Sequence, residues 1–171
     1  IGNTSEQYAK AFFETLPFDA ITVAPYMGSD SVQPFLKWKN KWTIVLGLTS
    51  NAGAADFELQ STGSELLYER VLNTVASWGS SDHMMFVIGA TRAEAFTRVR
   101  QIIPDHFLLV PGVGAQGGSL SEVFQHGQNN DVGLLVNVSR AIIYASGGSD
   151  FAEKARAVAQ EYQAEMAGLL Q

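Results

Sequence analysis

The chain has 171 residues, 46% hydrophobic and 16% charged, which fits one globular domain with a sizeable core and excludes a disordered chain. A net charge of −6 argues against a nucleic-acid-binding surface, and the lack of cysteine excludes disulfides and thiolate metal sites. No apolar run approaches the roughly 18 residues of a membrane helix, so we expect a soluble, cytoplasmic protein without membrane contacts.

Short apolar segments alternate with helical patterns along the whole chain. In chain order, the predicted strands are residues 20–24, 42–49, 84–89, 107–110 and 132–138. The predicted helices are residues 4–16, 34–39, 64–78, 91–103, 120–126 and 150–170. Capping residues at helix starts are predicted at Thr4 with Gln7, Ser64, Thr91 with Glu94, and Asp150 with Glu153. We find no linker or repeat, and residues 1–171 therefore belong to a single domain.

Strands that are apolar on both faces and joined by helices are typical of a parallel α/β architecture. Two closures are compatible with this pattern: an open doubly wound sheet, or part of a (β/α)₈ barrel. A complete barrel needs eight strands and about 250 residues. The pattern by itself therefore favours the open sheet.

In either architecture, functional side chains are expected at the carboxyl ends of the strands. The most distinctive of these ends is the segment 111–118, which has four glycines in eight residues. Such a loop can bring its backbone amides close to an anion, or it can be only a tight turn. Gln116 adds a donor within it, although the spacing fits neither a Walker sequence nor a clean GxGxxG pattern.

Arg140 follows the last predicted strand, after an apolar stretch in which a guanidinium needs a partner. In a barrel, the loops after the seventh and eighth strands often bind phosphate. An arginine there can hold a phosphate by two parallel hydrogen bonds, while Gln116 contacts another oxygen. The alternative is that Arg140 pairs with a carboxylate such as Asp150.

Other polar residues give no catalytic pattern. Three histidines lie at strand starts or a helix end, where we expect surface roles and neither a catalytic triad nor a zinc site; they are His83, His106 and His126. Asp56 and Glu58 resemble a carboxylate pair, but they lie in the loop 51–63, and we expect both to be solvated.

The order of these motifs resembles orotidine 5′-phosphate decarboxylase, in particular its longer bacterial subgroup. The resemblance extends over essentially the whole chain, and the motifs together are far more specific than any one of them. The matching segments are Ile1-Gly2-Asn3-Thr4, Val23-Ala24-Pro25-Tyr26-Met27-Gly28, Leu48-Thr49-Ser50-Asn51-Ala52-Gly53-Ala54, Leu109-Val110-Pro111-Gly112-Val113-Gly114-Ala115-Gln116-Gly117-Gly118 and Ser139-Arg140-Ala141-Ile142-Ile143-Tyr144. By this resemblance the fold is a (β/α)₈ TIM barrel, and this chain supplies strands 4–8 as the C-terminal part of a single barrel domain.

The resemblance implies a carboxy-lyase of de novo pyrimidine synthesis that converts orotidine monophosphate to uridine monophosphate and carbon dioxide. It implies no cofactor and no metal. Gln116 and Arg140 are implied to hold the 5′-phosphate, with the Ser139 backbone amide nearby. The glycine-rich segment is implied to belong to a loop that closes over this phosphate.

The remaining substrate contacts are implied in the same way. Ser50 matches a serine that hydrogen-bonds the pyrimidine, and Pro111 and Val113 match residues that line the base pocket. Thr4 matches a threonine that reaches the ribose across the interface of a homodimer.

One part of the family pattern is not in this sequence. The family's third strand carries Asp-x-Lys-x-x-Asp immediately before the isoleucine that matches Ile1. We therefore expect the catalytic lysine and aspartates just before Ile1, in the N-terminal part of the same barrel. The 171-residue piece alone is expected to be inactive and, because its sheet edges are exposed, poorly soluble.

Two other functions stay open at this point. Another phosphate-binding barrel enzyme, such as a sugar-phosphate epimerase or aldolase relative, would need acidic residues or a Schiff-base lysine at the strand ends. A catalytically silent module would keep the phosphate contacts and bind without turnover.

Overall fold

A computed structural model describes residues 1–114 and 116–171 and contains a parallel sheet of five strands in consecutive order, β1-β2-β3-β4-β5. The strands are β1 (Ala20–Val23), β2 (Trp42–Leu48), β3 (Met84–Ile88), β4 (Phe107–Pro111) and β5 (Leu134–Asn137). All five predicted strands are confirmed, and their ends differ from the prediction by at most two residues.

Helices follow the strands along the chain. They are α1 (Gly2–Lys10), α2 (Ser29–Leu36), α3 (Leu67–Ala76), α4 (Ala93–Ile102), α5 (Leu120–Gly127), α6 (Arg140–Ile143) and α7 (Phe151–Leu169). A π-helical turn, η1 (Ala11–Thr15), extends α1, and η2 (Ala52–Asp56) and η3 (Ala90–Arg92) are short 3₁₀ helices. Over the described ranges, none of these helices is long and apolar enough to cross a membrane.

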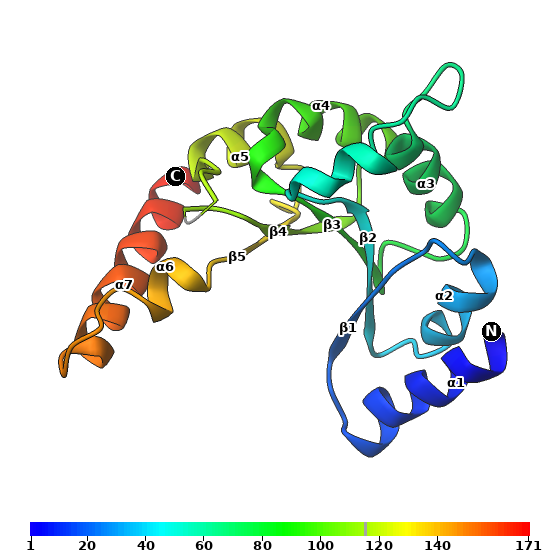
Figure 1. Cartoon of the computed structure of the whole chain (residues 1–171), viewed down its shortest axis with the longest axis horizontal. Coiled ribbons are helices and arrows are strands. Elements are labelled where there is room, and N and C mark those ends of the chain that lie inside the picture. The colour runs from blue at the N-terminus through cyan, green and yellow to red at the C-terminus, as the bar shows by residue number, and fades with distance from the viewer. Residues whose placement is uncertain (115) are drawn as a thin grey trace.

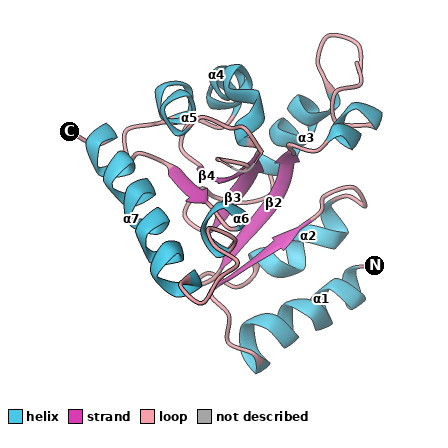
Figure 2. Cartoon of the chain, turned by 60° about the vertical axis from the view of Figure 1, so that its left-hand side comes forward, coloured by secondary structure: helices cyan, strands magenta, loops and turns pink. Residues whose placement is uncertain are grey.

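The strand order distinguishes between the two predicted closures. A doubly wound sheet reverses its strand order and places helices on both faces. Here the order never reverses, and right-handed crossovers of this kind put every helix on the same side of the sheet. Figures 1 and 2 show the helices outside a curved sheet, with α1 and α2 at one end and α7 at the other. The open doubly wound sheet is therefore wrong, and the chain has the topology of a barrel wall.

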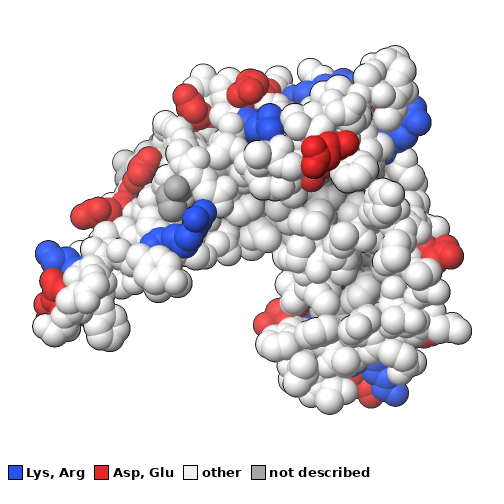
Figure 3. All heavy atoms as spheres, in the orientation of Figure 1, with Lys and Arg blue, Asp and Glu red and all other residues white. Residues whose placement is uncertain are grey.

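The two faces of the sheet carry different apolar layers. Side chains such as Val45, Phe86 and Leu108 point outward and pack against the helices in the main core. A second cluster on the concave face centres on Ile44, Met85 and Val87. Space-filling atoms show a wide hollow beneath the arch on this side (Figure 3). The apolar concave layer is the part of the structure that fits the interior of a closed barrel.

Several helix starts differ from the sequence-based expectation. Thr4 lies inside α1, and at the starts of α1, α4 and α7 the capping side chains make no hydrogen bond to the helix. Ser64 is not the cap of α3; the Glu69 carboxylate instead accepts the Leu66 N–H at 2.7 Å. Glu69 is also paired with Arg98 of α4, and this hydrogen bond, more than any other effect, lowers the pKa of the carboxyl group. The Glu69 carboxylate, which the half-exposed Arg98 also contacts, thus sets where α3 begins.

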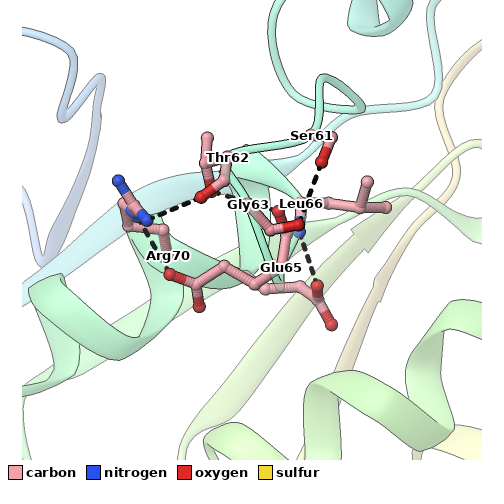
Figure 4. Close-up of polar contacts among 7 residues, drawn as sticks. Ser61, Thr62, Gly63, Glu65, Leu66 and Arg70 are labelled. Atoms are coloured by element: carbon pink, nitrogen blue, oxygen red, sulfur yellow. Dashed lines mark hydrogen bonds and ion pairs between the residues drawn. The ribbon is translucent and has the colours of Figure 1, made fainter.

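The turn that precedes α3 is held by an arginine of the helix itself. Arg70 donates from Nη2 to the Thr62 carbonyl and from Nε to the Glu65 carboxylate, each at 2.9 Å (Figure 4). Gly63 in this turn has a φ of 101°, which favours glycine. The chain therefore makes a closed turn over residues 61–66 before the helix starts at Leu67.

At the opposite end of the sheet from the strand C-termini, Arg100 of α4 binds several backbone carbonyls at once. Its Nε donates to Gly127 O at 2.6 Å, and its Nη atoms donate to His106 O at 2.7 Å and Gly133 O at 2.9 Å. A longer bond reaches Ile103 O at 3.2 Å. Burial lowers the pKa of Arg100 to about 10, so the group stays charged at neutral pH. One side chain thus joins the ends of α4 and α5 to the loops before β4 and β5.

His106 departs from the surface role expected of it. Both ring nitrogens are buried and lack a hydrogen-bond partner among the described residues. The ring contacts Phe86 edge-on, with centroids 5.3 Å apart. Burial lowers the pKa of His106, Asp105 opposes this shift, and Arg100 adds to it. A protonated imidazole is therefore disfavoured at this position.

The carbonyl contacts of Arg100 predict a large effect on stability. We expect Arg100→Met to lower the free energy of unfolding by about 3 kcal/mol, because buried carbonyls lose a charged donor. Chemical denaturation of the intact protein measures this. The matched control is Arg70→Met, since Arg70 is exposed and its loss is expected to cost about 1 kcal/mol or less. Equal effects of the two substitutions would contradict the role given to Arg100.

The lowered pKa of His106 predicts a pH dependence with a definite sign. Above about pH 6.5 the imidazole is neutral in both the folded and the unfolded chain. Below it, the unfolded chain takes up a proton that the folded chain resists, so the free energy of unfolding falls as the pH falls. We expect His106→Phe to flatten this slope in unfolding measurements between pH 5 and 8. His83→Phe is the control, and an unchanged slope in His106→Phe would count against the prediction.

Candidate functional site

Because all five strands are parallel, their carboxyl ends lie on one rim of the sheet. A polar pocket of about 240 Å³ opens there, after β4 and β5. Its lining residues are Pro111, Gly112, Val113, Gln116, Asn137, Ser139 and Arg140. The structure thus brings together five of the seven residues that the sequence singled out.

The glycine-rich segment after β4 folds back on itself. Gly114 N donates to Gly118 O at 3.1 Å, Gly117 N to Gly114 O at 2.8 Å, and Gly118 N to Gly112 O at 3.1 Å. Gly112, Gly114 and Gly117 have φ values of 98°, 74° and 87°, a region that side chains rarely allow. Ala115, which belongs to the same predicted motif, lies outside the described residues.

Neighbouring elements pack tightly against this loop. A Cβ added to Gly118 would lie 2.5 Å from the Cβ of Ala90, and one added to Gly114 would lie 2.1 Å from the hydroxyl of Tyr162. The loop after β3 and the long helix α7 therefore both touch the glycine loop. Close approach of backbone explains why glycine is needed at these two positions.

Ser50 does not line the polar pocket, but it lies next to it. A Cβ on Gly112 would meet the Ser50 hydroxyl at 3.1 Å and the Gln116 side-chain oxygen at 3.3 Å. The loops after β2 and β4 thus converge at Gly112, and the Ser50 and Gln116 side chains both lie beside the position that a Cβ of this glycine would take. The sequence could not show this proximity, because more than sixty residues separate the two side chains.

Arg140 is the first residue of α6, a short helix that the sequence analysis did not predict. Its side chain is exposed, and none of the ion pairs among the described residues includes it. Asp150, the alternative partner, accepts a hydrogen bond from the Ser146 hydroxyl at 2.6 Å. A guanidinium and the Gln116 amide at one pocket form a donor set suited to a phosphate or carboxylate.

Thr4 is not part of this pocket. It is exposed on α1, and Figure 1 shows α1 at the opposite end of the arch from α6. A contact of Thr4 with a ligand in another subunit therefore stays a prediction.

A larger cavity of about 370 Å³ lies beside α3 and the ends of β1 and β2. It is mostly apolar, and Tyr26, Glu58 and Tyr68 are the lining residues with polar side chains. Burial, more than the charge of Glu69, raises the pKa of Tyr68. No group of three or more potential metal-binding side chains occurs in the described part of the chain. The donor-rich smaller pocket is therefore the better candidate for an anionic ligand.

Glu58 is a residue that the sequence analysis misjudged. The expectation of a solvated loop carboxylate is wrong, because the side chain is partly buried and accepts two hydrogen bonds from Thr49. Asn137 was also missed as a pocket residue. Its position at a strand end, two residues before Ser139, was the available signal.

Known proteins resemble the chain over nearly its whole length. A family model described as "Orotidine 5'-phosphate decarboxylase / HUMPS family" matches residues 1–158. Orotidine 5′-phosphate decarboxylase of Flavobacterium johnsoniae is 61% identical over 99% of this chain and 62% of the relative. That of Christiangramia forsetii is 59% identical over 100% of this chain and 63% of the relative. The chain thus spans about three fifths of the length of these curated relatives.

Solved structures agree with these relatives. UMP synthase of Leishmania donovani superposes with a TM-score of 0.84 and 39% identity, over 96% of this chain and 37% of the other. OMP decarboxylase of the same organism superposes with a TM-score of 0.81 and 36% identity, over 95% and 63%. The fold of the chain therefore matches that of TIM-barrel decarboxylases.

The close packing around the glycine loop predicts a cost for adding a methyl group. We expect Gly118→Ala to lower the free energy of unfolding by about 1–3 kcal/mol, because its Cβ would meet the Gly112 carbonyl at 2.8 Å as well as Ala90. Gly147→Ala is the control, since nothing lies within 4 Å of its Cβ position, and a change of about 0.5 kcal/mol or less is expected. Urea denaturation compares the two, and equal stability would show that the loop is loosely packed.

Proposed function

Because the chain belongs to the orotidine 5′-phosphate decarboxylase / HUMPS family, we propose that the intact protein decarboxylates orotidine monophosphate to uridine monophosphate and carbon dioxide. The observation that carries this proposal is the convergence of Gln116, Ser139 and Arg140 on one donor-rich pocket at the rim of the sheet. The names of relatives that are 61% and 59% identical support the same activity.

In this proposal the pocket after β4 and β5 holds the 5′-phosphate. The Arg140 guanidinium forms charge-assisted hydrogen bonds to the phosphate oxygens, and Gln116 and the Ser139 backbone amide contact the others. The phosphate does not react. Its binding energy serves the reaction by holding the pyrimidine where interactions strengthen in the transition state.

The base and ribose are assigned to neighbouring parts of the rim. Ser50 hydrogen-bonds the pyrimidine, which is supported by its approach to Gly112 next to Gln116. Pro111 and Val113 line the side of the base pocket. In a homodimer, Thr4 of each protomer reaches the ribose bound by the other protomer.

We further propose that β1 to β5 are strands 4–8 of the barrel. Within the described residues, β1 pairs only with β2 and β5 only with β4, so each offers an edge to a further strand. The lysine that protonates C6 of the pyrimidine, and the carboxylates beside it, are assigned to a part of the barrel outside this chain. In support, the lysines of the chain do not follow strands; they are Lys10, Lys37, Lys39, Lys41 and Lys154. The reaction needs no cofactor.

Turnover of orotidine monophosphate by the intact protein, followed by absorbance, tests the proposed activity. Decarboxylation with saturable kinetics supports it. Tight binding of uridine monophosphate without turnover would instead indicate a silent binding module, and neither binding nor turnover would defeat the proposed function.

The role of Arg140 predicts a loss of phosphate-dependent affinity. We expect Arg140→Ala to weaken binding of uridine monophosphate by about 1.5–3 kcal/mol, the range for a hydrogen bond to a charged group. Binding of uridine, which lacks the phosphate, should hardly change. Titration calorimetry measures both ligands, and Arg156→Ala on the exposed side of α7 is the control. Equal affinity of the wild type for uridine and its monophosphate would contradict this assignment.

A further inference from the structure

The carboxylate of Glu58 is bound to the residue that precedes Ser50. Its Oε2 accepts the Thr49 backbone N–H at 2.7 Å, and its Oε1 accepts the Thr49 hydroxyl at 2.8 Å. Thr49 directly follows β2, so the carboxylate fixes the first residue of the loop. Hydrogen bonds to both oxygens of a charged carboxylate are among the stronger interactions that can hold a loop in place.

The backbone of Glu58 is tied to α3. Tyr68 N donates to Glu58 O at 2.9 Å, and Leu67 N donates to Gln60 O at 2.8 Å. The backbone carbonyl of Glu58 is thus held by α3, and its side-chain carboxylate holds the end of β2. The segment 50–57 forms a loop between these two anchors, with the 3₁₀ turn η2 inside it.

The Thr49 hydroxyl has a single proton, yet it lies within hydrogen-bond distance of both Glu58 and the Asn51 side-chain amide. Donation to the carboxylate uses that proton. The Asn51 side-chain oxygen faces this hydroxyl. If the amide is turned, its nitrogen donates to the hydroxyl oxygen instead, because the orientation of an Asn amide follows from its hydrogen-bond network. Thr49, Asn51 and Glu58 consequently form one connected set around Ser50.

We propose that Glu58 is a positioning residue that holds Ser50 against Gly112 and Gln116, and that it thereby sets the affinity of the site for the pyrimidine nucleotide. This proposal rests on the proposed function, in which Ser50 binds the base. Glu58 acts through Thr49 and makes no contact with the phosphate pocket; it lines the apolar cavity beside α3. Without the carboxylate, the loop 50–57 gains conformations that the bound state must lose again, and this lowers affinity.

The experiment compares three variants of the intact protein. Glu58→Ala removes both hydrogen bonds to Thr49. Glu58→Gln can keep both, because its oxygen accepts from the Thr49 N–H and its NH₂ group donates to the Thr49 hydroxyl. Asp56→Ala is the matched control, since it removes a carboxylate of the same loop that is exposed.

We expect Glu58→Ala to lower kcat/KM about tenfold, mainly through KM, while Glu58→Gln and Asp56→Ala stay within about twofold of the wild type. In the Ser50→Ala background, Glu58→Ala should add less than about twofold, because both substitutions remove the same interaction. Unchanged kcat/KM in Glu58→Ala, or effects that multiply fully in the double variant, would overturn the proposal.

Hydrogen exchange provides a readout that does not depend on activity. In Glu58→Ala the Thr49 amide should exchange faster, while the amides of β3 and β4 keep their wild-type protection. Faster exchange throughout the sheet would point to a general loss of stability and overturn the positioning role. If the wild type fails to turn over orotidine monophosphate, the proposed function fails, and the exchange of Thr49 still decides whether Glu58 holds this loop.

Discussion

The site of this protein depends on one constraint: parallel strands in unbroken consecutive order place every strand's carboxyl end on the same rim. Residues 50, 90, 112 and 139 are distant in sequence, but each follows a strand and therefore reaches that rim. The helices lie on the outer side, and the concave side keeps an apolar layer of its own. The polar pocket depends on β4 and β5 being parallel neighbours, because all of its lining residues lie at or after the ends of these two strands.

At that rim, the glycines of the loop after β4 matter because their lack of a side chain lets neighbouring segments approach closely. The glycine loop is in contact with the loop after β2, the loop after β3 and helix α7, through Ser50, Ala90 and Tyr162. Each contact occupies space that a Cβ would need. The Gly114, Gly117 and Gly118 amides donate to carbonyls of the loop itself. The loop can therefore present the Gln116 side chain to the pocket while its base is packed on three sides.

Stability and binding are assigned to opposite ends of the sheet. At the base, Arg100 joins backbone carbonyls from four segments, and burial lowers the pKa of the His106 imidazole. At the rim, Arg140 is exposed and without an ion pair among the described residues, ready for a charged ligand. Arg100 and Arg140 thus differ because carbonyls satisfy the donors of Arg100, whereas no ion pair within residues 1–114 and 116–171 engages Arg140. This division agrees with the general behaviour of barrels, whose lower face serves stability.

The five strands, the glycine-rich loop and the two pocket side chains Gln116 and Arg140 could be predicted from the sequence alone. These features depend on local periodicity and on residues adjacent to strand ends, so a linear reading finds them. The tertiary structure decided the strand order, which excluded the doubly wound sheet that the pattern favoured. It also shows the surroundings of Glu58, Arg100 and His106, because their partners, or the lack of them among the described residues, depend on groups brought together only by folding. Side-chain hydrogen bonds of Glu58 and Arg100 reach partners nine and thirty-three residues away. Hydrophobic periodicity cannot predict contacts between residues that are this far apart in the sequence.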